Sequence, residues 1–164
     1  MNRSIALGAA ADASARVLVL GSLPGTESLR RGESYAHPRN AFWCLIGPVV
    51  GKDLTDMPYS DRLSALRDAR VGLWDVIASA ERKGALDSAI QHPVAAKLAD
   101  LLRELPELRA IAFNGGTAAR HGRHQIPSVE GRDLLDLPSS SPAYAAMPFE
   151  EKARRWSVLA RYLR

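Results

Sequence analysis

The sequence contains only one cysteine, Cys44, among its 164 residues. A single thiol can form neither an internal disulfide nor a cysteine-rich metal site, so both are excluded. A reducing, cytoplasmic setting is therefore the default expectation. Because Cys44 lies within the apolar run at residues 42–46, we expect its side chain to be buried as a small hydrophobic residue.

Long hydrophobic runs are also missing from the chain. No stretch of about 18 apolar residues occurs, so neither a transmembrane helix nor a membrane partner is expected. The first residues are rich in alanine, but Asp12 directly follows a short apolar part, which is unlike an export signal. A chain of this length has room for one sizeable core. We therefore expect residues 1–15 to form a flexible N-terminal leader and residues 16–164 to form a single domain.

Neither sign of charge dominates, since 22 lysine and arginine residues face 18 aspartate and glutamate residues, for a formal net charge of +4. This modest basic excess permits a polyanionic partner without requiring one. Basic side chains gather at residues 120–124 and 152–164, and a solvated helix face explains the second group equally well. The 46% hydrophobic and 24% charged content is typical of a globular domain and excludes wholesale disorder.

Two kinds of apolar segment alternate along the chain. A short continuous run, typical of a strand buried on both faces, occurs at residues 17–20, and similar segments occur at residues 71–77, 109–113 and 133–137. Apolar residues at helical spacing occur at residues 60–69, 93–105 and 149–163. This alternation predicts an α/β fold, in which helices cover both faces of a parallel sheet and the loops after the strands share one edge. In such sheets the ligand site lies outside the carboxyl ends of the strands.

Two of these edge loops are rich in residues that suit a ligand site. Residues 21–25 read Gly-Ser-Leu-Pro-Gly, so the backbone can approach a ligand closely and its N–H groups could hold an anion or a water. Residues 137–144 contain three consecutive serines between prolines, which suits phosphate contacts but also an ordinary serine-rich turn. The G-x-G-x-x-G and G-x-x-x-x-G-K-[ST] patterns are missing, so no nucleotide cofactor is expected.

The first of these loops and the segment after it resemble the uracil-DNA glycosylase superfamily. The resemblance depends on Gly-Ser-Leu-Pro-Gly at 21–25 and on Ser-Tyr-Ala-His-Pro-Arg-Asn-Ala-Phe-Trp at 34–43. Looser matches follow in the family's order at residues 72–76, 81–82, 86–90, 113–115 and 137–142. Within the superfamily, the chain is most similar to the hypoxanthine-DNA (DNA-deoxyinosine) glycosylase family.

This resemblance implies a fold and a reaction. The fold would be a three-layer α/β sandwich with a central four-stranded, mainly parallel sheet, in agreement with the alternation of strands and helices. The reaction would be that of a monofunctional DNA glycosylase, which flips a deaminated base (hypoxanthine and/or uracil) out of damaged DNA and hydrolyses the N-glycosidic bond at the start of base excision repair. Such chemistry needs neither a metal nor a nucleotide cofactor, and one pocket per chain suits a monomer.

Two residues carry the main hypotheses about the site. Tyr35 matches the family's aromatic residue that stacks on the flipped base, and a half-buried loop tyrosine is the alternative. Asn40 matches the asparagine to which catalysis is assigned in the hypoxanthine enzymes. Its alternative role is a helix N-cap, because an apolar helix begins at Phe42.

The other candidates would hold the base or the DNA strand. Substrate-loop positions are Gly21, Ser22, Leu23 and Pro24, and strand contacts are Arg39, Ser139, Ser140 and Ser141. His37 either contacts the substrate or braces its own loop. Asp75 can accept a hydrogen bond from the ring N–H that hypoxanthine and uracil carry and that adenine and cytosine lack, or it caps the next turn. Asn114 either lines the pocket or takes the left-handed conformation of a turn.

Two leucines stand at positions that are catalytic in related enzymes. Leu23 replaces the water-orienting asparagine of the mismatch-specific uracil enzymes, and Leu137 replaces a histidine that stabilises the leaving base, so less charge stabilisation is expected here. Both substitutions support an alternative function, a non-catalytic nucleic-acid-binding module that retains the fold. A hydrolase with Ser22 as nucleophile is a weaker alternative, because no G-x-S-x-G elbow is present. No aspartate–lysine arrangement suggests a covalent sugar intermediate, so no lyase activity is expected.

Overall fold

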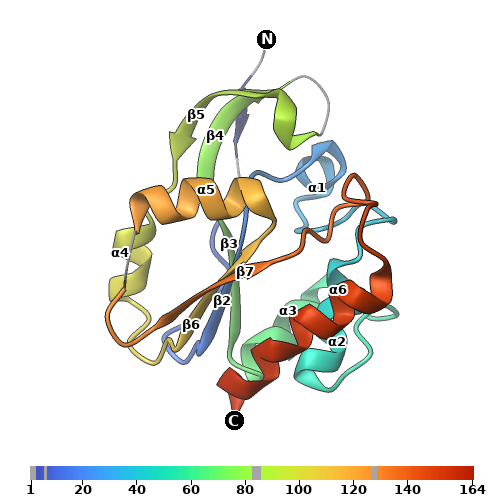
Figure 1. Ribbon diagram of the computed structural model, residues 1–164, viewed down its shortest axis with the longest axis vertical. Coiled ribbons are helices and arrows are strands. Elements are labelled where there is room, and N and C mark those ends of the chain that lie inside the picture. Colours follow the sequence, from blue (N-terminus) through green and yellow to red (C-terminus); the bar gives the residue numbers. More distant parts are fainter. Residues whose placement is uncertain (1–2, 6, 83–85, 127–128) are drawn as a thin grey trace.

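Four of the apolar segments form a single parallel sheet. The computed structural model describes residues 3–5, 7–82, 86–126 and 129–164. The sheet has the spatial order β3-β2-β6-β7 and consists of β2 (Val17–Gly21), β3 (Val71–Asp75), β6 (Ala110–Asn114) and β7 (Asp133–Leu137). Every neighbouring pair is parallel, so the four carboxyl ends share one edge (Figure 1). The predicted α/β sandwich around a four-stranded sheet is confirmed.

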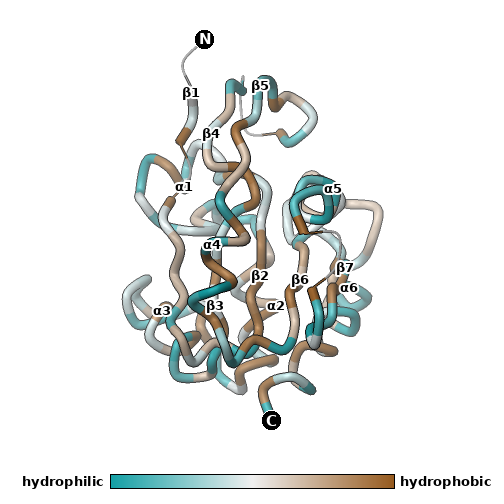
Figure 2. The backbone as a smooth tube through the Cα atoms, turned by 90° about the vertical axis from the view of Figure 1, so that its left-hand side faces the viewer, coloured by the Kyte–Doolittle hydropathy of each residue, from teal (hydrophilic) through white to brown (hydrophobic). Residues whose placement is uncertain are grey.

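Helices cover both faces of this sheet because successive side chains of a strand point to opposite sides. One face of β2 packs with α4 (Leu98–Arg103) and α5 (Gly116–Gln125). The other face is covered by α2 (Phe42–Val50), α3 (Tyr59–Asp68), α6 (Phe149–Trp156) and the 3-10 helix η2 (Ser157–Leu163). Figure 2 shows β2 and β6 as hydrophobic along their length and α5 as largely hydrophilic. Among the described residues, no helix is long and apolar enough to cross a membrane.

A second, antiparallel sheet lies beyond the carboxyl edge of the first (Figure 1). Its order is β1-β4-β5, with β1 (Arg3–Ile5), β4 (Ile77–Arg82) and β5 (Ile90–Ala95), and the short 3-10 helix η1 (Asp87–Ala89) precedes β5. The run at 71–77, expected as one strand, is therefore divided, because β3 ends at Asp75 and β4 begins at Ile77.

The helix expected at residues 93–105 is wrong in its first part. Pro93 and Val94 belong to β5, and α4 begins only at Leu98. Proline is compatible with a strand at the edge of a sheet, since its missing N–H can face away from the partner. Pairing with β4, which joins Val94 to Ser79, therefore overrides the helical spacing of the apolar residues. The rest of the stripe does form the buried face of α4.

The N-terminal segment, expected as a flexible leader, contacts the domain at two places. Residues 3–5 form β1, which pairs with β4. Farther along, Ala10 and Leu73 exchange two backbone hydrogen bonds of 2.9 and 3.0 Å. A Cβ atom on Gly72 would lie 2.6 Å from the Cβ of Ala11, so only glycine allows this close approach.

Helix α2 corrects the expectation for the cysteine. Phe42, Trp43, Leu45 and Ile46 are buried, as expected for a helix on the sheet. Cys44, in contrast, is exposed. In a helix of 3.6 residues per turn, the position between two buried pairs lies on the opposite face, so an apolar neighbourhood in sequence did not mean burial.

Candidate active site at the carboxyl edge of the sheet

The end of β2 brings a carboxyl and a hydroxyl group against one glycine. Gly21 pairs with Asp75 at the ends of β2 and β3. A Cβ atom built on Gly21 would lie 2.7 Å from Asp75 Oδ1 and 2.9 Å from the hydroxyl oxygen of Tyr35. Any side chain here would displace these two polar groups. Glycine is therefore required at this position so that the two side chains can approach the backbone.

The ring of Tyr35 rests on a buried aromatic platform. It stacks on Phe42 with ring centroids 4.0 Å apart and planes 14° from parallel. Phe42 is fully buried and meets Trp156 edge-on at 5.7 Å. Because Phe42 covers one face of the tyrosine ring, only the opposite face is left to stack on another planar group.

The backbone around Tyr35 is held in an unusual conformation. Its φ of 55° lies in the left-handed region, which is uncommon for residues other than glycine. Both neighbouring peptide groups are fixed by hydroxyl groups: Ser34 N–H donates to Tyr59, and Ala36 N–H donates to Ser28, each at 3.0 Å. Strain of this kind persists only where surrounding contacts impose it, and it is concentrated at functional sites.

Burial sets the protonation of the two acidic groups at the edge. Burial raises the pKa of Asp75 to about 7, the negative charge of Asp87 adds to the shift, and Arg82 opposes it. The pKa of the Tyr35 hydroxyl is also raised by burial and by the charge of Asp75, while a hydrogen bond with Asn114 opposes the rise. Tyr35 therefore stays neutral, whereas Asp75 changes its charge near neutral pH.

Asn114, at the end of β6, anchors the serine loop. Its side-chain amide donates to Ser140 Oγ and accepts from Ser140 N–H, both at 2.9 Å. The carbonyl of Ser140 in turn accepts from Ala41 N–H at 3.0 Å. The left-handed turn considered for Asn114 is wrong, because Gly115 takes the positive φ of 95°. The hydroxyl of Ser140, a residue only 1% exposed, is sealed away from a DNA strand.

Asn40 lies directly before Ala41, the N-cap residue of α2, and its side chain both bonds to the first residue of that helix and borders a cavity. Its Oδ1 accepts from Phe42 N–H at 3.0 Å, at the start of α2. It is half-buried and lines a cavity of about 300 Å³ together with Tyr35 and His37. A carbonyl oxygen has two acceptor positions, so the bond from Phe42 N–H leaves one position of the Asn40 oxygen for a second partner such as water.

This cavity lies between the loop at 31–40 and the helices α2 and α3. On its helical side lie buried Trp43, exposed Cys44 and half-buried Arg62, and the Arg62 guanidinium is 5.1 Å from the centroid of Trp43. Gly21, Asp75 and Asn114 are not among its lining residues. The structure thus divides the candidates into two groups: Gly21, Asp75 and Asn114 lie at the edge of the sheet, whereas His37 and Asn40 line the cavity. Tyr35 belongs to both groups.

The candidate strand contacts are accessible, except for Ser140. Arg39 and His37 are exposed, and His37 Nδ1 accepts from Arg39 N–H at 3.1 Å, so His37 does brace its loop. Ser139 and Ser141 are half-buried, and each hydroxyl accepts from the N–H two residues later, at 3.1 Å. These hydroxyls can still donate to a phosphate oxygen.

Comparison with known proteins decides the family. The model of the uracil DNA glycosylase superfamily matches residues 8–162. The chain belongs to this superfamily. A hypoxanthine DNA glycosylase of Methanosarcina acetivorans is 35% identical over 151 residues, which are 92% of this chain and 94% of the relative. A second protein of that name, from Methanosarcina barkeri, is 39% identical over 132 residues, 80% of this chain and 82% of the relative.

A solved structure supports the same assignment. The solution NMR structure of a candidate uracil DNA glycosylase from Methanosarcina acetivorans matches with a TM-score of 0.87 and 34% identity, and the match covers 99% of both chains. The resemblance inferred from the motifs at 21–25 and 34–43 is therefore confirmed at the level of the superfamily and its fold.

In this member of the uracil DNA glycosylase superfamily, the loop at 21–25 is held by residues that sequence reasoning gave no role. Ser22 Oγ donates to Asp87 at 2.7 Å, and Arg82 donates to the carbonyls of Leu23 and Pro24. Leu23 is 6% exposed and its side chain packs in the core, so it offers only its backbone to the site. The available signal for Arg82 was its place in the looser family match at residues 81–82, to which sequence reasoning assigned no role.

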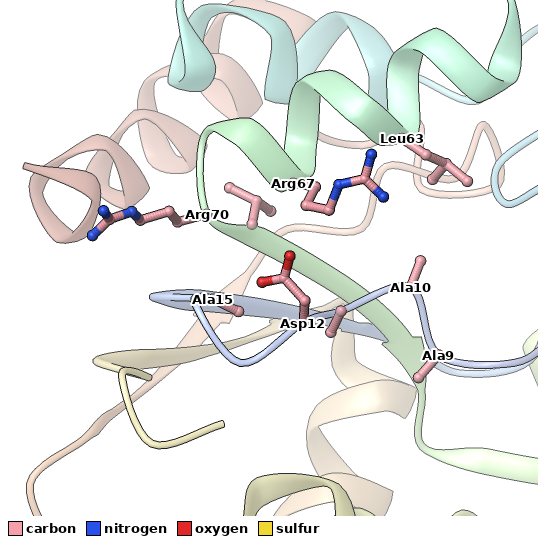
Figure 3. A pocket seen from close by; sticks show the side chains of 9 residues that line it. Ala9, Ala10, Asp12, Ala15, Leu63, Arg67 and Arg70 are labelled. Carbon is pink, nitrogen blue, oxygen red and sulfur yellow. The ribbon is translucent and has the colours of Figure 1, made fainter. Parts of the chain in front are cut away.

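Another cavity of about 330 Å³ lies away from this edge (Figure 3). It is lined by Ala9–Ala11, Asp12, Arg67, Arg70 and Val71, at the start of β3. Volume alone does not identify the site here, because this cavity contains none of the residues that the superfamily resemblance singles out.

Proposed function

We propose that this superfamily member is a monofunctional DNA glycosylase that flips hypoxanthine and/or uracil out of DNA and hydrolyses the N-glycosidic bond, initiating base excision repair. The observation that carries the proposal is the arrangement around Gly21. There, a tyrosine ring backed by Phe42 and a buried carboxyl group meet at the carboxyl edge of the sheet. The names of the two Methanosarcina relatives support hypoxanthine as a substrate.

Tyr35 would hold the flipped base by stacking. Its ring is fixed on one side by Phe42, so a base that enters from the other side extends an existing aromatic stack. Base–aromatic stacking contributes about 1–3 kcal/mol and tolerates purines and pyrimidines alike. Holding the tyrosine in place before the base arrives reduces the entropy lost when the base binds.

Asp75 would distinguish hypoxanthine and uracil from adenine and cytosine, the bases from which deamination produces them. In its ionised form it only accepts hydrogen bonds, and hypoxanthine and uracil both present a ring N–H that adenine and cytosine lack. An undamaged adenine or cytosine would leave the buried carboxylate without a donor, which is unfavourable. Because the pKa of Asp75 is about 7, the accepting form is well populated in neutral solution.

Asn40 would orient the attacking water. The side-chain oxygen that accepts the hydrogen bond from Phe42 N–H can also accept a hydrogen bond from a water molecule. The N-glycosidic bond breaks and its electron pair leaves with the base, while the water oxygen bonds to the sugar carbon and loses one proton to solvent; the base takes up one proton in turn. Leu137 supplies no charge to the leaving base, so positioning and stacking would contribute most of the rate.

The DNA strand would bind along the rim of the site. Arg39 is exposed and always charged, and Ser139 and Ser141 lie on the loop that Asn114 fixes through Ser140. Such contacts position the strand without reading its sequence. A site made of one chain's own residues suits a monomer that works inside the cell with chromosomal DNA.

Two substitutions at Asn40 separate catalysis from capping. A serine hydroxyl can still accept from the N–H two residues later, as those of Ser139 and Ser141 do, whereas alanine loses this bond at a cost of about 1 kcal/mol. We expect Asn40→Ser to keep the wild-type Tm but to excise hypoxanthine about 100-fold more slowly, a loss typical of one removed positioning group. The assay follows alkali-labile abasic sites in labelled duplexes that contain inosine or uracil.

The outcomes of this experiment are distinct. Asn40→Ala should lose both rate and Tm. If Asn40→Ser turns over like the wild type, Asn40 is only a helix cap and the proposed mechanism is wrong. If the wild type binds every lesion without forming abasic sites, the chain is a binding module that retains the fold.

A further inference from the structure

The loop at 21–25 turns all of its inner carbonyl groups toward β4 and the turn before it. The carbonyl of Gly21 accepts from Val76 N–H at 2.8 Å, and that of Ser22 accepts from Ile77 N–H at 3.1 Å. The carbonyls of the next two residues, Leu23 and Pro24, both accept from the guanidinium of a single side chain, Arg82.

This arrangement fixes the direction of the loop's N–H groups. In a planar trans peptide, the N–H group points opposite to the carbonyl of the same peptide bond. Because the carbonyls point toward β4 and Arg82, the N–H groups of Ser22, Leu23 and Gly25 point away from them. None of these three N–H groups donates to an acceptor among the described residues. Unpaired donors of this kind, next to Asp75 and Tyr35, are suited to an anionic or carbonyl-bearing ligand.

The side chain of Arg82 is almost completely buried, which is unusual for a charged group. The residue is 7% exposed, and its Nε has no partner among the described residues. Its nearest carboxylate, Asp87, is 3.9 Å away and also accepts the hydroxyl proton of Ser22. Burying a charged group with an unsatisfied donor is costly, so this side chain is not explained by stability alone.

We propose that Arg82 is a positioning residue of the active site, which holds the loop at 21–25 so that its N–H groups face the flipped base. The proposal rests on the function proposed above. The fork of the guanidinium matters here, because two neighbouring carbonyls are bound at once by a group with donors in fixed directions. A lysine could keep the charge but not both contacts in the same geometry.

Arg132 offers a matched control. Its guanidinium also donates to two carbonyls, those of Leu105 and Leu108, at 3.1 and 3.3 Å. These contacts lie beside the starts of β6 and β7, at the opposite edge of the sheet from the site. Arg132→Met therefore removes the same kind of bond without touching the loop at 21–25.

The kinetic test measures single-turnover excision of hypoxanthine from a duplex by the wild type, Arg82→Met, Arg82→Lys and Arg132→Met. We expect Arg82→Met to lower the maximal rate about 100-fold, as misplacement by about 1 Å does. Affinity for the duplex should change less than about threefold, and Arg82→Lys should recover part of the rate. If the loss in Arg82→Met merely equals that in Arg132→Met, or falls on affinity instead of rate, the proposal is overturned.

The pH dependence of the excision rate distinguishes a positioning role of Arg82 from a simple loss of stability, because loss of stability would not shift it. Asp75 is influenced by Arg82 on β4 and by Asp87 of η1, and Tyr35 lies beside it; Asp87 also acts on His121 of α5. Removing the positive charge of Arg82 should move the ascending limb of the rate profile to higher pH, while Arg82→Lys should leave it near the wild-type position. An unchanged limb in a folded Arg82→Met protein would overturn the proposal.

A spectroscopic measurement decides the question independently of activity. In the proton–nitrogen NMR spectrum, the amide signals of Ser22, Leu23 and Gly25 should shift or broaden in Arg82→Met, and those of β7 should not. If the wild type forms no abasic sites, the proposed function fails while this measurement still tests the loop. Should Arg82→Met not fold, Arg82→Lys with wild-type rate and unchanged loop signals would overturn the proposal.

Discussion

At the scale of single residues, the site depends on groups that are held away from their most stable states. Tyr35 has a left-handed backbone, Asp75 is a buried carboxyl with a raised pKa, and Arg82 has a buried unpaired donor. Tyr35 and Asp75 lie against Gly21 at the end of β2, and Arg82 contacts the loop that follows β2. Sites of this kind trade stability for a fixed arrangement of reactive groups, and substitutions at them can stabilise the fold while removing function.

Asp75→Asn should stabilise the fold, because it removes a buried group that becomes charged. The pKa of Asp75 is about 7 in the folded protein against an ordinary value of 3.8. Between these values the folded protein holds a proton that the unfolded chain releases, so stability falls as the pH rises from about 4 to about 7. The asparagine variant avoids burying the charge. We expect its free energy of unfolding to exceed that of the wild type by a few kcal/mol at pH 8, since one pKa unit corresponds to about 1.4 kcal/mol.

The same substitution should change the pH dependence of excision. The wild-type rate should rise through about pH 7 as Asp75 ionises, whereas the asparagine keeps an acceptor oxygen at every pH and should give a flat profile there. Urea unfolding at pH 4 and pH 8 and rates across this range provide the check. Equal stabilisation at both pH values would contradict the assigned pKa.

At the scale of elements, hydrogen bonds connect the loops at the carboxyl edge of the sheet to one another. Asn114 connects β6 to the serine loop after β7, and Ser140 connects that loop to the start of α2. Position along the sheet edge could be predicted from the strand pattern, because parallel strands place their following loops together. The cross-links could not, because they depend on side chains and backbone groups that are distant in sequence.

Asn114→Ala tests this joint. It leaves the N–H and hydroxyl groups of Ser140 buried without partners, which costs about 1–3 kcal/mol each when water cannot reach them. We expect Asn114→Ala to lower the free energy of unfolding by at least about 2 kcal/mol. Ser140→Ala, which removes only one of the two bonds, should cost less. Denaturant titration measures both, and an equal or smaller loss in Asn114→Ala would show that the joint is not formed.

At the scale of the whole molecule, much of the fold could be predicted and the second sheet could not. The strands at 17–20 and 109–113 were recognisable because burial on both faces requires continuous apolar runs, and the edge strand β7 was recognisable from its three leucines. In contrast, β1, β4 and β5 were missed, since β5 is mostly exposed and its apolar spacing imitates a helix. The sequence placed the candidate site residues at the carboxyl edge of the sheet, but it did not indicate that Tyr35 lies between two groups of residues or that Arg82 donates to the loop at 21–25.

The proposed function requires that a flipped, deaminated base stacks on Tyr35 and that its N-glycosidic bond is then cleaved. The most direct measurement compares the wild type with Tyr35→Ala on duplexes that contain hypoxanthine, uracil or adenine at one position. We expect abasic sites at a deaminated base but not at adenine, and a loss of excision in Tyr35→Ala far larger than its loss of affinity for undamaged DNA. Equal losses in excision and affinity, or abasic sites at adenine, would contradict the proposed function.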